Sequence, residues 1–160
     1  MIAIINSSGA NIASVKFALE RLDVRSVLTD DANVIRSADK VVLPGVGAAP
    51  VAMQRLASAG LIDCIRTLQQ PVLGICLGMQ LLFSRSAEGN VPLLGLFDAT
   101  CNAFTPTFER SVPHMGWNQL VFLQDHPLLA GVDNGAHVYF VHSYFAPVTT
   151  QTIAGCSYGH

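Results

Sequence analysis

Charged side chains are scarce in this chain of 160 residues, where Asp, Glu, Lys and Arg together account for only 12% of the positions. Hydrophobic residues account for 51%, which excludes intrinsic disorder as a description of the whole chain. No apolar run reaches the roughly 18 residues of a membrane-spanning helix, so we expect no membrane partner. The formal net charge is −2, so we expect no nucleic-acid partner either. So little charge indicates that another protein covers part of the surface.

Metal-binding and disulfide patterns are also lacking. The sequence has four cysteines and no Cys-x-x-Cys pair, and their spacing matches neither a zinc site nor a disulfide framework. We therefore expect no metal and no cofactor. The N-terminal segment has no basic stretch and no small-residue cleavage site, so it does not have the pattern of a signal peptide. We expect free thiols and a cytoplasmic location.

The first half of the chain alternates short apolar runs with segments of helical periodicity. Apolar runs without polar alternation are typical of parallel strands that are buried on both faces. This order predicts an α/β fold, a doubly wound and mostly parallel sheet with helices on both faces. The predicted strands are 2–5, 24–29, 41–43 and 72–75, and the predicted helices are 12–22, 31–37, 61–68 and 77–83.

The second half of the chain has weak helical signals and several segments that favour strands. We predict strands around 99–104, 118–123, 137–145 and 152–156, with a short helical stretch at 125–130. This pattern predicts an antiparallel extension of the same sheet. No linker or repeat separates the two halves, so we expect a single domain over residues 1–160.

The strongest chemical motif is Gly74-Ile75-Cys76-Leu77-Gly78, which lies where a predicted strand meets a predicted helix. It has the form of a nucleophile elbow, in which a strained turn exposes the nucleophile and the flanking glycines let the backbones cross closely. In such a turn the N–H of Leu77 points to where an oxyanion forms. The alternative is that Cys76 is a small buried residue between incidental glycines. For the other cysteines, Cys64, Cys101 and Cys156, core packing is the better interpretation.

Ligands of open α/β sheets bind at the carboxyl ends of the strands. Three loops are therefore candidates for the site: those after Ile5, after Leu43 and after Ile75. The loop after Leu43 begins Pro44-Gly45-Val46-Gly47, and its glycines allow backbone N–H groups to face a ligand. This turn could supply a second oxyanion donor, or it could be an ordinary turn between a strand and a helix.

The elbow, extended by Met79-Gln80, and the Pro44–Gly47 turn together resemble those of class I (triad) glutamine amidotransferases, which have a flavodoxin-like fold. Two further stretches, 113–118 (Pro-His-Met-Gly-Trp-Asn) and 139–144 (Tyr-Phe-Val-His-Ser-Tyr), resemble the glutaminase subunits of imidazole glycerol phosphate synthases in histidine biosynthesis. The resemblance implies that the chain hydrolyses L-glutamine through a thioester on Cys76. It also implies a heterodimeric lyase complex, in which ammonia passes to a (β/α)8-barrel cyclase subunit.

The resemblance assigns further roles residue by residue. Without it, we would interpret Gln80 as an exposed helix residue, and Ser143 and Tyr144 as part of an ordinary strand face. Core packing of a loop is an equally good interpretation of the residues expected at the partner interface. The implied roles are Val46 or Gly47 with Leu77 for the oxyanion hole, and Gln80, Ser143 and Tyr144 for substrate binding. His114, Met115 and Trp117 are candidates for the interface with the implied partner, because aromatic and methionine side chains are enriched in interface cores.

The sequence departs from the family at one point. The family carries a late Phe-His-Pro-Glu stretch whose His is the general base and whose Glu orients it, and these 160 residues contain no His-Pro-Glu. The one His-Pro pair, His126-Pro127, is followed by Leu128. We therefore expect a C-terminally incomplete domain that is weakly active or inactive as a polypeptide of 160 residues. Two alternatives remain: a triad amidotransferase of another pathway, and a non-catalytic module that docks on the barrel partner.

Overall fold

The computed structural model describes residues 1–6 and 12–158 and forms two compact units, Met1–Cys101 and Asn102–His160. The turn predicted after Ile5 lies outside the described residues, except for Asn6. Strand β7 (Phe97–Ala103) begins in the first unit and ends in the second. The expectation of a single domain stays a prediction.

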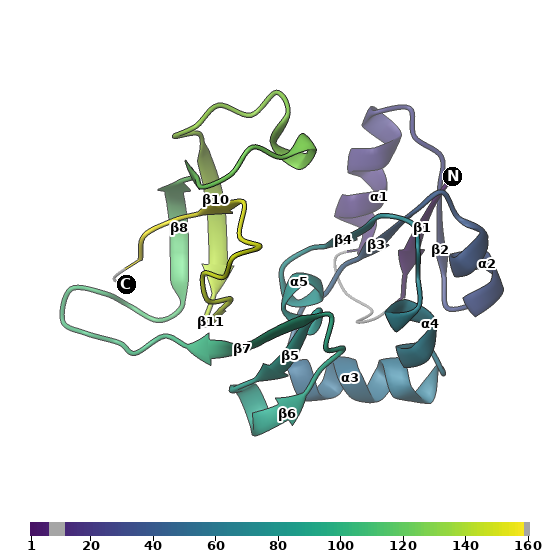
Figure 1. Ribbon diagram of the computed structural model, residues 1–160, viewed down its shortest axis with the longest axis horizontal. Helices are drawn as coiled ribbons and strands as arrows, with labels where there is room; N and C mark the ends of the chain where they lie inside the picture. The colour runs from purple at the N-terminus through teal and green to yellow at the C-terminus, as the bar shows by residue number, and fades with distance from the viewer. Residues whose placement is uncertain (7–11, 159–160) are drawn as a thin grey trace. The chain divides into compact units, whose positions relative to one another are not determined.

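A parallel sheet of four strands forms the centre of the first unit, as the apolar runs predict (Figure 1). The strand order is β2-β1-β3-β4, and the central strands β1 and β3 are buried over most of their length. Strands without a polar face can be buried in this way only where helices pack on the sheet. The strands are β1 (Ile2–Ile5), β2 (Ser26–Thr29), β3 (Lys40–Leu43) and β4 (Val72–Gly74).

The helices of the first unit largely follow the predicted pattern. Asp31 caps α2 by accepting a hydrogen bond from the Asn33 N–H at 2.7 Å, as expected from its place before the helix. The sequence pattern does not predict α3, because small alanines instead of large aliphatic residues occupy much of its buried face. The helices are α1 (Ile12–Arg21), α2 (Ala32–Ser37), α3 (Ala49–Ser58), α4 (Ile62–Arg66) and α5 (Leu77–Leu81).

Two expectations about the chain after Cys76 were wrong in detail. The helix expected over 77–83 ends at Leu81, because Phe83 already begins β5 and pairs with Phe97 of β7. The later strands form small sheets of their own instead of extending the parallel sheet. The remaining elements are β5 (Phe83–Ser86), η1 (Glu88–Asn90), β6 (Val91–Pro92), β8 (His114–Gln119), β9 (Val121–Phe122), η2 (Pro127–Leu129), β10 (His137–His142), β11 (Tyr144–Phe145) and β12 (Ala154–Gly155).

The burial pattern gives the physical reason for the separate sheets. Along the antiparallel pair β8 and β10, exposed residues alternate with more buried ones. A strand with one solvated face fits an antiparallel ladder, whereas the parallel sheet needs strands that are apolar on both faces. In Figure 1, β8 and β10 form a long pair within the second unit.

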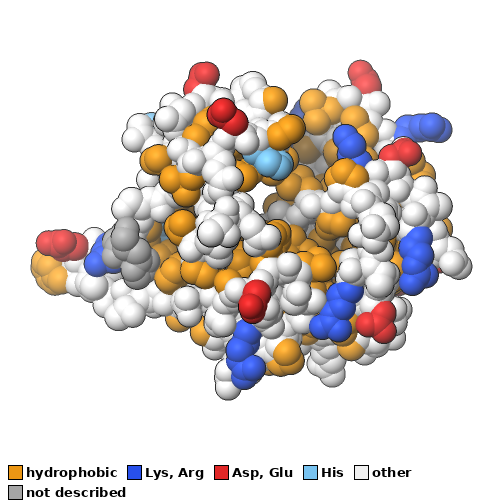
Figure 2. All heavy atoms as spheres, in the orientation of Figure 1, with side chains coloured by type: hydrophobic (Ala, Val, Ile, Leu, Met, Phe, Trp, Pro, Cys, Tyr) orange, Lys and Arg blue, Asp and Glu red, His pale blue; other side chains and the backbone are white. Residues whose placement is uncertain are grey.

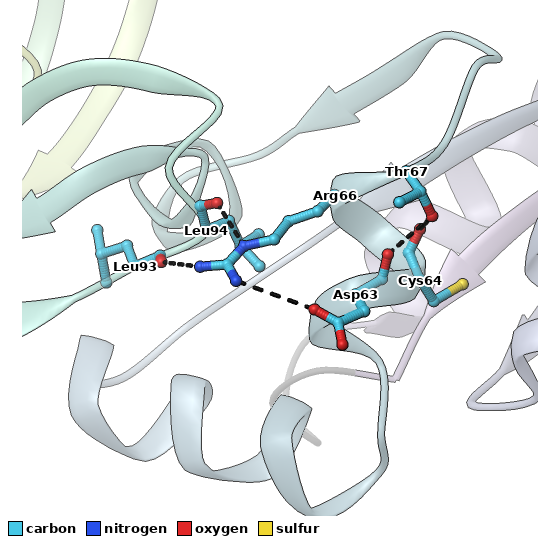
Figure 3. A network of polar contacts seen from close by, with 6 residues as sticks. All are labelled: Asp63, Cys64, Arg66, Thr67, Leu93 and Leu94. Carbon is cyan, nitrogen blue, oxygen red and sulfur yellow. Dashed lines mark hydrogen bonds and ion pairs between the residues drawn. The ribbon is translucent and has the colours of Figure 1, made fainter.

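An arginine connects α4 to the turn after β6 (Figure 3). The Arg66 guanidinium donates hydrogen bonds to the carbonyl oxygens of Leu94 at 2.8 Å and Leu93 at 3.2 Å, and it lies 4.0 Å from the Asp63 carboxylate. Both leucine side chains are buried. The arginine therefore fixes the buried turn against the end of the helix, and the guanidinium satisfies carbonyl groups that would otherwise need water.

The surface reflects the low charge of the sequence. Figure 2 shows many hydrophobic side chains on the visible face, with lysines, arginines and acidic residues few and scattered. Within residues 1–6 and 12–158, none of the helices has the length and hydropathy of a membrane span.

Candidate active site

Cys76 lies on the turn that joins β4 to α5, with φ 53° and ψ −118°. A positive φ is uncommon for a residue with a Cβ, and a strained backbone of this kind costs about 1–3 kcal/mol. The Cys76 carbonyl oxygen accepts hydrogen bonds from the N–H groups of Met79 at 3.0 Å and Gln80 at 3.2 Å, which hold the turn in place. The Cys76 side chain is exposed. The turn thus has the strained, exposed form that a nucleophile elbow requires.

The two flanking glycines are necessary for this turn. A Cβ on Gly78 would lie 1.8 Å from the carbonyl oxygen of Leu43, at the end of β3. A Cβ on Gly74 would lie 2.6 Å from the Cα of Met79. In both places the obstacle is backbone, which cannot rotate away as a side chain can. The glycines therefore let α5 start in direct contact with the end of β3.

The turn after β3 packs against the elbow. A Cβ on Gly45 would lie 2.7 Å from the Gly78 nitrogen, and the Ile75 N–H donates to the Leu43 carbonyl oxygen at 3.0 Å. Gly47 has φ +91°, a conformation that side chains rarely adopt. The structure therefore brings the elbow and the Pro44–Gly47 turn together at one edge of the sheet, as the loop argument predicts.

The first unit thus gathers the residues that the sequence assigns to the oxyanion hole. Leu77 begins α5, and within the described residues no acceptor forms a hydrogen bond with its N–H. Val46 and Gly47 lie in the neighbouring turn, and both are exposed. The assignment of these backbone groups to an oxyanion remains a proposal.

Burial distinguishes Cys76 from the other three thiols. Cys64 and Cys101 are buried, and the Cys64 thiol donates to the Ala32 carbonyl oxygen at 3.8 Å. Burial raises the pKa of the Cys101 thiol to about 11 and also raises the pKa of Cys156. Because the thiolate is the nucleophile, these positions favour core packing, as the sequence suggested.

Gln80 lies on α5, one turn after Cys76. Its side chain is buried, with 6% of the residue exposed, so it is not the exposed helix residue that we would have assumed without the resemblance. The Gln80 carbonyl oxygen also accepts a contact from the Cys101 thiol at 3.8 Å. Gln80 is one of three buried polar residues among those that the structure describes, and substrate binding remains its proposed role.

Ser143 and Tyr144 lie in the second unit, where β10 passes into β11. The Ser143 carbonyl oxygen accepts from the Phe104 N–H at 3.0 Å, and Tyr144 pairs with Ala103 of β7. The Tyr144 carbonyl oxygen accepts from His142 Nδ1 at 2.9 Å. The segment therefore has a fixed backbone, and both side chains are half-buried.

A pair of histidines supports this segment, and no sequence pattern predicts the contact between them. His142 Nε2 lies 3.1 Å from His114 Nδ1. Because the Tyr144 carbonyl only accepts, His142 carries its proton on Nδ1, and its Nε2 then accepts from His114 Nδ1–H when both rings are neutral. Burial lowers the pKa of His114, and the charge of a protonated His142 lowers it further.

The three residues expected at the partner interface do not share one surface. His114 is 3% exposed and lies stacked between Tyr158, at a ring-centroid distance of 3.8 Å, and Phe140, at 4.9 Å. His114 therefore has an interior side chain, and its place at a partner interface stays a prediction. Met115 and Trp117 are 61% and 69% exposed on the opposite face. The reason is the alternation of a strand, which sends neighbouring side chains to opposite faces.

Histidines are confined to the later part of the sequence. All five follow residue 101, so the unit that holds Cys76 contains none. Among residues 1–6 and 12–158, no group of His, Cys, Asp and Glu side chains could hold a metal ion.

Comparisons with known proteins show the family of the chain. The family model for glutamine amidotransferase class-I matches residues 4–155. An "Imidazole glycerol phosphate synthase subunit HisH" from Xanthomonas axonopodis pv. citri (strain 306) is 52% identical over 158 residues, which cover 99% of this chain and 79% of that protein. A protein of the same description from Xylella fastidiosa (strain Temecula1) has the same identity and coverage.

The fold comparison agrees with the family. A solved structure described as a glutamine amidotransferase superposes with a TM-score of 0.72 at 17% identity, covering 96% of this chain and 78% of that one. At this identity the likeness supports the α/β fold alone. The family match and the 52% identity show that the chain belongs to the class I glutamine amidotransferases and, within them, to the family of imidazole glycerol phosphate synthase subunits HisH.

Proposed function

We propose that this chain is the glutaminase subunit of an imidazole glycerol phosphate synthase, hydrolysing L-glutamine to glutamate and ammonia for histidine biosynthesis. The observation that carries the proposal is the turn at Cys76, which exposes a thiol on a strained backbone beside the Pro44–Gly47 turn. The names of the relatives that are 52% identical supply the reaction context.

The proposed chemistry begins with the Cys76 thiolate. Its sulfur attacks the side-chain amide carbon of glutamine, and the carbonyl oxygen becomes an oxyanion. The N–H of Leu77 and an N–H from Val46 or Gly47 stabilise that charge, since backbone donors that are already in place need no reorganisation. The carbon–nitrogen bond then breaks, ammonia leaves with an added proton, and a glutamyl thioester remains on Cys76. Water hydrolyses the thioester and restores the thiol.

Two of these steps need a general acid–base. Ammonia must be protonated as it leaves, and the attacking water must lose a proton. The resemblance places this role on the His of a His-Pro-Glu triplet, which these 160 residues do not contain.

The amino-acid end of the substrate is assigned to Gln80, Ser143 and Tyr144. Gln80 brings a buried amide one helical turn beyond the nucleophile. Ser143 and Tyr144 offer a hydroxyl, a phenol and backbone groups from a segment that hydrogen bonds hold in place. Groups of this kind can bind both the amino and the carboxylate group of an amino acid.

The proposed partner is a (β/α)8-barrel cyclase subunit that receives the ammonia. Met115 and Trp117 expose large apolar side chains on one face of the β8–β10 pair, with Tyr139 and Val141 beside them. Exposed aromatic and methionine side chains are enriched in the cores of protein interfaces. The four free thiols in the structure favour a reducing compartment, so we also propose a cytoplasmic location.

The test is glutamate release from L-glutamine by the chain together with a cyclase subunit, compared with Cys76→Ser. We expect Cys76→Ser to abolish the glutamine-dependent reaction and to leave ammonia-dependent synthesis by the cyclase unchanged. Binding to the cyclase without glutamate release or thioester formation would favour a non-catalytic docking module. Association with the synthase subunit of another pathway would favour a different triad amidotransferase.

A further inference from the structure

Ser143 lies at the point where the chain leaves one sheet and joins another. Strand β10 ends at His142, which pairs with His114 of β8. Strand β11 begins at Tyr144, which pairs with Ala103 of β7. The two residues proposed to bind substrate, Ser143 and Tyr144, therefore lie where the pairing partner changes. Backbone groups at such a point need partners beyond the ladder of a single sheet.

The backbone hydrogen bonds show which way Tyr144 faces. The Phe104 N–H donates to the Ser143 carbonyl oxygen at 3.0 Å. In an antiparallel ladder, a bond at this place makes the pair of Tyr144 and Ala103 a non-hydrogen-bonded pair. The N–H and C=O groups of Tyr144 therefore point away from β7, toward groups outside this ladder.

His142 meets the Tyr144 carbonyl on that side. Its Nδ1–H donates to the carbonyl oxygen at 2.9 Å. The bond joins the last residue of β10 to the first residue of β11, so it spans Ser143. Because a peptide unit is planar, holding its carbonyl also orients the rest of the unit. The histidine thus adds a side-chain contact to the backbone pairing that this segment makes with β7.

His114 stabilises the tautomer of His142 that makes this contact. Its Nδ1 lies 3.1 Å from His142 Nε2 and donates to it when both rings are neutral. The opposite tautomer would leave the bare Nδ1 of His142 against the Tyr144 carbonyl oxygen, with no proton between them. His114 is itself held in place, since it is 3% exposed and stacked between Tyr158 and Phe140.

We infer that His142 is a positioning residue for substrate binding, which orients the Ser143–Tyr144 backbone through the Tyr144 carbonyl and is itself oriented by His114. The inference rests on the proposed function, because that function assigns the amino-acid end of glutamine to this segment. Groups that are ordered before the substrate arrives bind it more tightly, since ordering them later costs affinity. Loss of the contact should therefore weaken binding and leave the reaction of the bound substrate nearly unchanged.

The experiment compares two thioesters that acylate Cys76 in the full chain, mixed with an excess of cyclase subunit. The first is the S-methyl γ-thioester of L-glutamate. The second is S-methyl butanethioate, which has the same reacting group but no amino or carboxylate group. In both reactions the cysteine sulfur displaces methanethiolate, and mass spectrometry quantifies the acyl-enzyme. Comparing the two rates isolates the recognition of the amino-acid end.

We expect His142→Leu to raise the half-saturating concentration of the glutamyl thioester at least about fivefold, which is the order of one lost hydrogen bond. The saturating rate and the rate with S-methyl butanethioate should change less than about twofold, below the worth of a typical hydrogen bond. His142→Asn should restore binding to within about twofold of the wild type, because its Nδ2–H can replace Nδ1–H. His137→Leu, the same change at the exposed start of β10, is the matched control.

His114→Phe tests the second hydrogen bond, and it decides the question where His142→Leu does not fold. Phenylalanine can keep the stack with Tyr158 and Phe140 but donates nothing to His142. We expect the half-saturating concentration of the glutamyl thioester to rise about two- to threefold. Nitrogen NMR of the His142 ring should show a smaller fraction of protonated Nδ1 than in the wild type.

Four results would overturn the inference. The first is a wild-type half-saturating concentration in His142→Leu, or in His114→Phe where only that variant folds. The second is an equal loss of rate with both thioesters, which indicates general damage. The third is a fall in the saturating rate alone, which indicates a role at the reacting carbon. The fourth is His142→Asn binding no better than His142→Leu.

Failure of the proposed function would give a different result. Wild-type Cys76 would then form no acyl-enzyme from the glutamyl thioester while iodoacetamide still alkylates it, or it would react equally well with S-methyl butanethioate. Both outcomes are read from the wild type alone. They are therefore distinct from the four results that concern the histidines.

Discussion

Replacing Gly78 by alanine tests how closely the elbow packs on the parallel sheet. The new Cβ would lie 1.8 Å from the Leu43 carbonyl oxygen. Even weak carbon–oxygen contacts rarely come closer than about 3.3 Å, so α5 and the end of β3 must separate by roughly 1.5 Å. Overpacking of a core costs about 1–3 kcal/mol and occasionally more. We expect the upper end of that range, because the opposing atoms are backbone.

The displacement also moves the nucleophile away from the segment that carries the proposed oxyanion donors. A misplacement of about 1 Å can cost about 100-fold in a catalysed reaction. We therefore expect Gly78→Ala to lose about 3 kcal/mol in urea unfolding and to acylate Cys76 about 100-fold more slowly. The unfolding is followed by far-UV circular dichroism. The acylation of Cys76 by the S-methyl γ-thioester of L-glutamate is followed by mass spectrometry.

Two further alanine substitutions test whether the losses of stability and of acylation rate follow the closeness of the contact at each glycine. Gly45→Ala would place its Cβ 2.7 Å from the Gly78 nitrogen, so we expect a smaller loss in both measurements. Gly155→Ala is the matched control, because no atom lies within 4 Å of its Cβ position, and its stability should stay within about 0.5 kcal/mol of the wild type. A Gly78→Ala protein with wild-type stability and wild-type acylation would refute the close packing of strand and helix.

The other predictions concern the thiols, the buried histidine and the exposed tryptophan. With a limiting amount of iodoacetamide, Cys76 should be labelled before the three cysteines that are wholly or partly buried, and equal labelling of all four in a peptide map would contradict the elbow. The pKa of His114 is lowered in the folded chain, so the unfolded chain binds the proton more readily. The free energy of unfolding should therefore fall as the pH drops below about 6.5, by up to about 1.4 kcal/mol per pH unit. His114→Phe should flatten this slope in urea unfolding at pH 7.5 and 5.5, whereas the exposed His137→Gln should keep it. Trp117→Ala should weaken binding of the cyclase subunit at least about 30-fold in calorimetry, because the tryptophan is expected to be an interface hot spot. The free energy of unfolding should fall by only about 1 kcal/mol or less, from the loss of the ring contact with Tyr139.

The features that depend on neighbouring residues could be predicted from the sequence. The strands β1 to β4 follow from short apolar runs, and the elbow follows from two glycines around a cysteine at a strand–helix junction. Both patterns are complete within a few residues. The Asp31 cap was predictable for the same reason.

The features that depend on distant partners could not be predicted in this way. The cap of α3 comes from Glu88, which lies 39 positions away and has no local pattern that marks it. The hydrogen bond between His114 and His142 joins strands whose register the sequence does not specify. One of these features does have a local signal. In a strand, His114 must point away from Met115 and Trp117, so its side chain and theirs lie on opposite faces.

The distribution of aromatic residues has a consequence for spectroscopy. The one tryptophan, Trp117, and all three tyrosines lie after residue 101, so the unit that holds Cys76 contains neither residue type. Absorbance and fluorescence near 280–300 nm therefore report the second unit almost alone. Because Trp117 is 69% exposed, its emission should shift to shorter wavelength when a partner covers the β8–β10 face. A fluorophore on the Cys76 thiol would give the first unit a signal of its own, so that the unfolding of each unit could be followed separately in one sample.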